Sequence, residues 1–238
     1  MSPQFDERPR MESSALCTTC LYEAPLFQGL ANNELDYLSQ FTSERISKKG
    51  EMVVHEGDAI THLSFLKKGL LKLYTGSNDG KGQIISLAKP NDCVGLLSVF
   101  STPNYHYSMN AIEDSWLCHV MMEPVKEVLR RNGDFGITIL ARVSKAADFI
   151  IQHNLELSRL HLRGRIAYIL LDFSENIYNS LSFELPVSRK EIGELIGMTT
   201  ENVIRILSEF RRDELITISN KTITIWNVEM LRRISKSG

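Results

Sequence analysis

The most regular hydrophobic pattern of the chain lies between residues 188 and 210, in SRKEIGELIGMTTENVIRILSEF. Apolar residues recur every three or four positions on both sides of Gly197, which predicts two short amphipathic helices. Ser188 and Glu191 have the spacing of a capping box that begins the first helix, and Thr199 suits the N-cap of the second. Gly197 can adopt the positive φ that ends a helix. Two short helices joined by such a turn predict a helix-turn-helix.

Two alternating runs follow these helices, in LITISNKTITIW. Their apolar residues fall at every second position on each side of Asn220 and Lys221, which predicts two strands joined by a short hairpin turn. Another helical pattern, LRGRIAYILLDFSENI, comes before the helix pair. A helix-turn-helix followed by a β-hairpin is a winged helix. We therefore expect a winged helix-turn-helix domain over residues 161–238.

Residues 25–125 have a different pattern, with short β-type runs such as EMVVHEG and HLSFLKKG separated by glycines. Eight of the 14 glycines lie between Gly29 and Gly95, as the tight corners of a compact barrel or sandwich require. We expect a jelly-roll-like β-roll here, preceded by an N-terminal arm over residues 1–24. The fold class is then α+β.

The period becomes helical again in residues 126–160, where a long helix is expected from about Asp134 to Leu160. Alternating steps of three and four residues give the a/d spacing of a coiled-coil seam. This seam consists of Leu140, Val143, Ala147, Ile150, Asn154 and Leu157. A helix this long between two domains would otherwise expose much apolar surface, so we expect it to form a dimer interface. The alternative is a helix packed only on its own domains, which Phe149 and Ile151 would allow by widening the stripe.

Composition narrows the classes of function. The 238 residues are 43% hydrophobic and 24% charged, as in soluble globular proteins. No apolar run reaches the length of a membrane span and the N-terminus lacks a signal peptide's apolar core, so we expect a cytoplasmic protein without a membrane partner. The net charge of −2 does not by itself indicate a nucleic-acid binder. No catalytic triad, phosphate loop or pair of catalytic carboxylates stands out, so we expect no enzyme.

The order of β-roll, long helix and winged helix-turn-helix resembles the Crp/Fnr transcription regulators, from Leu26 onward. The matching segments are GDAITHLSFLKKGLLKLY, NDCVGLLSVF, RGRIAYILLDF and SRKEIGELIGMTTENVIRILSEFRRDELI. The last is the most specific, because recognition helices of the family carry a Glu and, four residues later, an Arg, where Glu201 and Arg205 stand here. The resemblance implies a homodimer that binds a two-fold site in double-stranded DNA and contacts RNA polymerase. It also implies that a signal in the β-roll reaches the recognition helices through the long helix.

The spacing of these two residues suits recognition of DNA bases. Residues four apart lie on one helix face, so Glu201 and Arg205 can enter the major groove together. Arg205 can then donate two hydrogen bonds to a guanine, and Glu201 can accept one from a cytosine. Polar residues at the helix starts can meet phosphate or a base edge. The expected DNA-binding residues are Ser188, Arg189, Thr199, Thr200, Glu201, Asn202 and Arg205. The alternative is a solvated Glu201–Arg205 ion pair on an exposed helix.

The sequence argues against a cyclic nucleotide as the signal. Relatives that bind one have a Glu after the glycine of the corresponding loop, which holds the ribose, and soon afterwards an Arg-Ser pair that holds the phosphate. Here Leu96 follows Gly95, and the later segment TPNYHYSMN contains no arginine. A buried cyclic phosphate without a cationic partner is strongly disfavoured. We therefore expect no cyclic nucleotide to bind in the usual way.

Four cysteines offer a redox alternative. Cys17 and Cys20 form a C-x-x-C pair, and Cys118 lies in the strand-type run SWLCHVM. This resembles the oxygen-sensing branch of the family, in which arm cysteines and one from this strand hold a [4Fe–4S] cluster. A further arm cysteine of that branch has no counterpart here, so Cys93 would have to be the fourth ligand. The alternative is that Cys93 and Cys118 are small core residues and that the arm pair is redox-active or incidental.

Two further alternatives stay open at this point. One of the six histidines could ligate haem iron, although no sequence feature selects it and a surface or core histidine is the plainer interpretation. The chain could also be a small-molecule or redox sensor, or an interaction protein, that does not bind specific DNA. Sequence-selective, salt-dependent DNA binding distinguishes the regulator from such a sensor.

Overall fold

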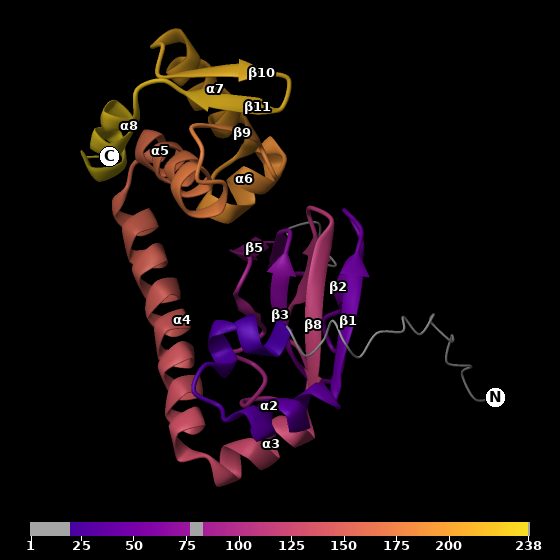
Figure 1. The fold of residues 1–238 in the computed structure, drawn as a ribbon. Helices are drawn as coiled ribbons and strands as arrows, with labels where there is room; N and C mark the ends of the chain where they lie inside the picture. The colour runs from indigo at the N-terminus through magenta and orange to yellow at the C-terminus, as the bar shows by residue number, and fades with distance from the viewer. Residues whose placement is uncertain (1–19, 77–82, 238) are drawn as a thin grey trace, which may run out of the picture.

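The computed structural model describes residues 20–76 and 83–237. An N-terminal β-roll and a C-terminal, mainly helical domain are joined by one long helix, α4 (Gly133–Arg159), which runs along one side of the molecule (Figure 1). The expected α+β class is confirmed. Within the described ranges, no helix combines the length and the apolar character that crossing a membrane requires.

The β-roll consists of two four-stranded antiparallel sheets. One sheet has the strand order β1 (Thr42–Ser47), β8 (Ser115–Met121), β3 (His62–Lys68) and β6 (Cys93–Val94). The other has the order β2 (Met52–Val54), β7 (Ser108–Ala111), β4 (Leu71–Thr75) and β5 (Gln83–Ala88). Leu66, Met109 and Leu117 belong to an apolar core that both sheets share.

Helices cover the outer face of the first sheet. They are η1 (Pro25–Phe27), α2 (Asn32–Ser39), α3 (Met122–Arg131) and the start of α4. Leu63 and Phe65 of β3 join the core beneath these helices, whereas Leu66 joins the core inside the roll. Because successive side chains of a strand point to opposite faces, β3 contributes apolar residues to the cores on both of its sides.

The C-terminal domain is a winged helix-turn-helix, as predicted. Its helices are α5 (Leu162–Asp172), the short π-helix η2 (Phe173–Ile177), α6 (Arg189–Ile196), α7 (Thr200–Arg212) and α8 (Val228–Ser237). Its strands are β9 (Ser182–Glu184), β10 (Ile216–Ser219) and β11 (Thr222–Ile225), in the order β10-β11-β9. The wing thus has a third strand that the sequence pattern did not predict.

The predicted helix ends of this domain are confirmed. Ser188 and Glu191 form the capping box of α6. The Thr199 hydroxyl accepts a hydrogen bond from the Asn202 amide at the start of α7. Gly197 has a φ of 65° and ends α6 in the left-handed region, where a side chain would be strained.

The C-terminal domain also packs directly on the β-roll, independently of α4. Helix α6 lies over β5 (Figure 1). The β-roll residues Leu70, Ile84 and Ile112 belong to the same apolar core as the C-terminal domain. The two domains therefore contact each other directly, in addition to being joined by α4.

Polar contacts surround this shared core. Lys72 of β4 forms an ion pair with Glu191 of α6, and both side chains are only 23% exposed. The Tyr178 hydroxyl of the C-terminal domain donates a hydrogen bond of 2.6 Å to Glu113 of the β-roll. Because Glu191 also caps α6, this ion pair attaches the first helix of the helix-turn-helix to the β-roll.

Replacing Lys72 with Gln should loosen this attachment, because the largely buried Glu191 would lose its cationic partner. A hydrogen bond between charged groups contributes roughly 1.5–3 kcal/mol. Backbone amides of α6 should then exchange with deuterium at least about fivefold faster, as measured by hydrogen-exchange mass spectrometry. Lys48→Gln is the control, since it removes an exposed ion pair with Asp114 inside the β-roll and should leave α6 unchanged. Equal exchange of α6 in wild type and K72Q would contradict this role.

Candidate nucleic-acid interface and sensor site

The rotation of α7 about its axis is fixed by its apolar residues. Those that are buried in the domain core are Val203, Ile206, Leu207 and Phe210. Successive residues of an α-helix are turned by roughly 100°, so the opposite face is defined as well. Its exposed residues are Glu201, Ile204, Arg205, Ser208 and Arg212. The predicted pair Glu201 and Arg205 thus lies on the outer face of the helix.

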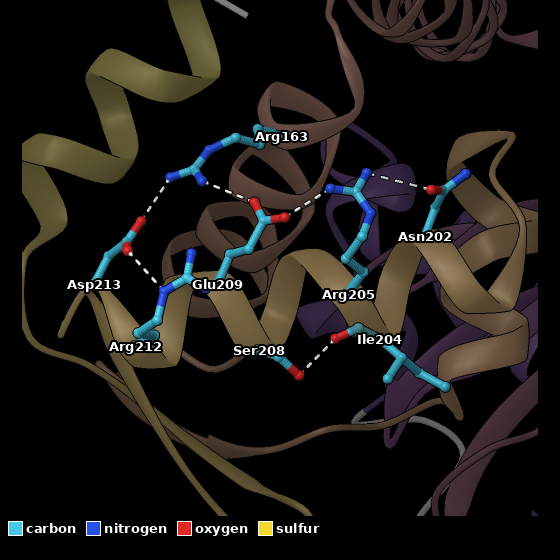
Figure 2. A network of polar contacts seen from close by, with 8 residues as sticks. All are labelled: Arg163, Asn202, Ile204, Arg205, Ser208, Glu209, Arg212 and Asp213. Carbon is cyan, nitrogen blue, oxygen red and sulfur yellow. Dashed lines mark hydrogen bonds and ion pairs between the residues drawn. The ribbon is translucent and has the colours of Figure 1, made fainter.

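Arg205 is held by neighbours on its own helix (Figure 2). Its Nη1 donates a hydrogen bond of 2.6 Å to Glu209, and its Nη2 donates one of 3.3 Å to the side-chain oxygen of Asn202. The Glu209 carboxylate also accepts a hydrogen bond of 2.9 Å from Arg163 of α5. The ion pair of Arg205 therefore runs to Glu209 and not to Glu201, the partner that the sequence suggested for a solvated pair.

The Glu201 carboxylate lies at the other end of this face, at the start of α7. Hydrogen bonds from its own backbone amide and from the Thr199 hydroxyl lower the pKa of the Glu201 carboxyl. The carboxylate is therefore ionised at neutral pH and acts only as a hydrogen-bond acceptor. This is the state that can accept a hydrogen bond from a cytosine amino group.

The remaining predicted DNA-binding residues lie at the starts of α6 and α7. The Ser188 and Thr199 hydroxyls cap the two helices and accept hydrogen bonds from backbone amides. Arg189, Thr200 and Asn202 are half-buried at the same two helix ends. Both ends carry the positive pole of a helix dipole, which favours phosphate.

Ile204, on the same face, is not among the residues predicted from the sequence. Its side chain is 50% exposed although it is apolar. The spacing could have placed Ile204 on the outer face, because position 204 is three residues after Glu201 and therefore on the same side of the helix. The hydrophobic pattern gave no role to an apolar residue at that position.

On the sensor side, a cavity of about 490 Å³ lies between three parts of the molecule. The β-roll contributes Leu87 and Gly95, and α4 contributes Arg142 and Ile150. The C-terminal domain contributes side chains of α5, η2 and α6, among them Leu195. The cavity therefore borders the β-roll, the long helix and the helix-turn-helix together.

Aromatic side chains pack around the loop at which cyclic-nucleotide-binding relatives hold their ligand. A Cβ added to Gly95 would lie 2.9 Å from the Tyr105 ring and 3.4 Å from the Tyr107 hydroxyl. The Tyr107 hydroxyl accepts a hydrogen bond of 3.1 Å from Ser98. Burial raises the pKa of Tyr105 to about 12, so this side chain stays neutral. The segment TPNYHYSMN, which contains no arginine or lysine, thus brings two tyrosines to Gly95.

The cysteines lie in two places. Cys20 donates a hydrogen bond to Glu44 and accepts one from Lys67, and Glu44 pairs directly across the strands with Cys118. Cys93 is on the far side of β3, since Phe65 pairs with Cys118 on one side and with Cys93 on the other. Burial raises the pKa of Cys93 to about 12, which disfavours the thiolate that iron requires.

The three described cysteines of the predicted cluster do not lie together in one place. Cys93 is separated from Cys20 and Cys118 by Phe65, and Cys17 lies outside the described residues. Within residues 20–76 and 83–237, no group of three or more His, Cys, Asp or Glu could hold a metal ion. Because Cys17 lies outside the described residues, the arrangement of all four cysteines is not defined, and the cluster stays a prediction.

Comparisons with known proteins agree with this architecture. The cyclic nucleotide-binding domain family matches residues 44–132, and the Crp-like helix-turn-helix domain family matches residues 164–234. The transcriptional activator protein Anr of Pseudomonas protegens is 29% identical over 223 residues, which cover 91% of each chain. The fumarate and nitrate reduction regulatory protein of Vibrio cholerae is 28% identical, over 83% of this chain and 81% of that protein.

The fold is also found among solved structures. The structure of FixK2 from Bradyrhizobium japonicum matches with a TM-score of 0.73 and 23% identity, over 81% of this chain and 96% of that one. Two matched domains in this order, one on each side of α4, and relatives that align along most of the sequence confirm the resemblance seen in the residues. The chain belongs to the Crp/Fnr family of transcriptional regulators.

Proposed function

We propose that this DNA-binding regulator acts as a homodimer that places its two α7 helices in adjacent major grooves of a two-fold site. The observation that carries the proposal is the outer face of α7, where Glu201 and Arg205 are exposed within a Crp-like helix-turn-helix. The family consists of regulators rather than enzymes. Contact with RNA polymerase is part of the proposal, and relatives named as transcriptional activators support it.

The direct test is selection of DNA from a random duplex library with the full-length protein. A consensus with two related half-sites about one helical turn apart is expected, with affinity that falls as salt rises. The alternative function, a sensor or interaction protein without specific DNA binding, predicts that no consensus emerges under any redox condition.

In this proposal Arg205 reads a guanine and Glu201 a cytosine, whereas the residues at the helix starts contact phosphate. Arg205 has to leave Glu209 in order to donate both hydrogen bonds to guanine. Arg163 then keeps Glu209 paired, so no carboxylate is left without a cation. This second partner lowers the free energy that the rearrangement would otherwise require.

Arg205→Ala should weaken binding to the selected site by about 1–3 kcal/mol and relax the preference at one base pair. Arg189→Ala is the matched comparison at the start of α6. As a phosphate contact, Arg189 should affect specific and non-specific DNA alike and reduce the salt dependence. Both variants are titrated against the selected site and its single-base substitutions at two salt concentrations. A loss for Arg205→Ala that is equal on every sequence would make Arg205 a phosphate contact instead.

We propose that the dimer forms through the face of α4 that the chain's own domains leave uncovered. Of the expected seam, Leu140 lies on this side with the exposed Ile137 and Ile151, Ala147 is half-exposed, and Asn154 is exposed but also borders the cavity. The other three expected residues contact their own chain. Val143 packs against the N-terminal core, Ile150 lines the cavity and Leu157 is buried in the C-terminal core. The proposed interface therefore differs from the expected seam at every second position, where the next residue of the helix takes part. Ile151, for example, replaces Ile150.

Ile151→Glu should prevent dimerisation, because a carboxylate in a helix–helix interface would be buried without a partner. Ile151 is 54% exposed within one chain, so the monomer should remain folded. We expect a monomer in sedimentation velocity and loss of binding to the two-fold site. Gln152→Glu adds the same charge on the next residue, turned by roughly 100°, and should remain dimeric. A dimeric Ile151→Glu variant would place the interface elsewhere.

We also propose that a signal in the β-roll reaches the recognition helices by two routes. One route is α4, as the family resemblance implies. The other is the packing of α6 on the β-roll, which the Lys72–Glu191 ion pair supports. The cavity borders both routes, since it is lined by β-roll residues, by α4 and by Leu195 of α6.

The signal that we propose is not a cyclic nucleotide, because tyrosine side chains pack around Gly95. Cyclic AMP or cyclic GMP at millimolar concentration should leave both the melting temperature and the DNA affinity unchanged. A ligand at 100 times its Kd would stabilise the folded protein by about 2.7 kcal/mol, so micromolar binding would be visible in a thermal melt. The selected DNA site is the positive control, since it should raise the melting temperature. A clear shift with either nucleotide would contradict the expectation.

A further inference from the structure

We propose that Ile204 is a specificity-determining residue that reads the C5-methyl group of a thymine in the major groove. This inference rests on the proposed function, in which α7 lies in that groove. Glu201 and Arg205 would make polar contacts to bases, and Ile204 would add an apolar contact that specifies one more base.

The position of Ile204 has no explanation in the packing of its own domain. The buried side of α7 is already complete, with Val203 and Ile206 both fully shielded from solvent. Ile204 is 50% exposed on the outer side. Figure 2 shows its side chain pointing away from Glu209 and Arg163, so it lies outside the polar network that holds Arg205.

Its surroundings on the helix are those of a base contact. Ile204 lies three residues after Glu201 and directly before Arg205, on the same outer face. The hydroxyl of Ser208, one turn further on, donates a hydrogen bond of 2.9 Å to the Ile204 carbonyl. That hydroxyl is therefore directed at the helix backbone, and the two side chains lie beside each other on this side of α7 (Figure 2).

The chemistry of Ile204 selects the base. An isoleucine side chain can neither donate nor accept a hydrogen bond, so it gains nothing from the polar edges of guanine, cytosine or adenine. The thymine methyl is the apolar group that bases present in the major groove. Four residues of helix advance by about 6 Å, and base pairs are spaced by about 3.4 Å. The thymine should therefore lie within one or two base pairs of those read by Glu201 and Arg205.

The test removes the methyl group and nothing else. The site selected with the full-length protein is synthesised with each thymine replaced in turn by deoxyuridine, which pairs identically but lacks the C5-methyl group. Wild type should bind about fourfold more weakly when one particular thymine of either half-site is replaced singly. This factor corresponds to the ~0.8 kcal/mol gained on burying one methyl-sized group.

Two variants assign that effect to Ile204. Ile204→Ala removes most of the apolar side chain and should bind the thymine and deoxyuridine sites equally well. Ile204→Val retains two methyl groups and should still distinguish them. Because the side chain is half exposed, both variants should melt within a degree or two of wild type, which a thermal melt checks.

The outcomes separate this inference from the proposed function. If no DNA consensus is selected, the proposed function fails. If a consensus is selected but no deoxyuridine substitution matters, or if Ile204→Ala is as sensitive to it as wild type, the role of Ile204 is overturned. That role is also overturned if Ile204→Ala weakens binding to all DNA sequences equally, since Ile204 would then contact the DNA backbone or a protein.

Discussion

Burial of the apolar side of α7 is the interaction on which the DNA-reading surface depends. Val203, Ile206, Leu207 and Phe210 can enter the core at only one rotation of the helix, and that rotation turns Glu201, Ile204 and Arg205 outward. The close approach of α6 to the turn is part of the same constraint. A Cβ at Gly193 would lie 2.5 Å from the Met198 carbonyl oxygen, so a larger residue would displace the turn that positions α7.

Local signals made the helix-turn-helix predictable from the sequence. Its caps, its left-handed Gly197 and the alternation of its hairpin are each set by residues a few positions apart. Strand β9 gave no such signal, because its partner β11 lies about forty residues further along. The packing of α6 on β5 could not be predicted from the sequence either, since it joins residues about one hundred positions apart.

For the long helix and the cysteines, residue spacing alone did not determine which side chains are buried or lie next to each other. Helix α4 has apolar residues on more than one side, and a seven-residue pattern cannot tell which side meets the chain's own domains. Leu157 and Leu140 share one predicted seam, yet Leu157 is buried in the C-terminal core and Leu140 is 60% exposed. Cys93 and Cys118 likewise lie on the same face of one sheet, and only the strand order shows that Phe65 lies between them.

The two oxygens of the Glu191 carboxylate have different partners, and this makes the ion pair between the domains asymmetric. One oxygen accepts from Lys72, whereas the other accepts from the Ser188 amide at the start of α6. Exchanging the two charges, with Glu at 72 and Lys at 191, could restore the attraction but would leave the helix without its cap. Glu191 therefore serves both the ion pair and the helix cap, whereas Lys72 has no part in the cap. A change at Lys72 can therefore weaken the contact between the domains while the cap of α6 stays intact.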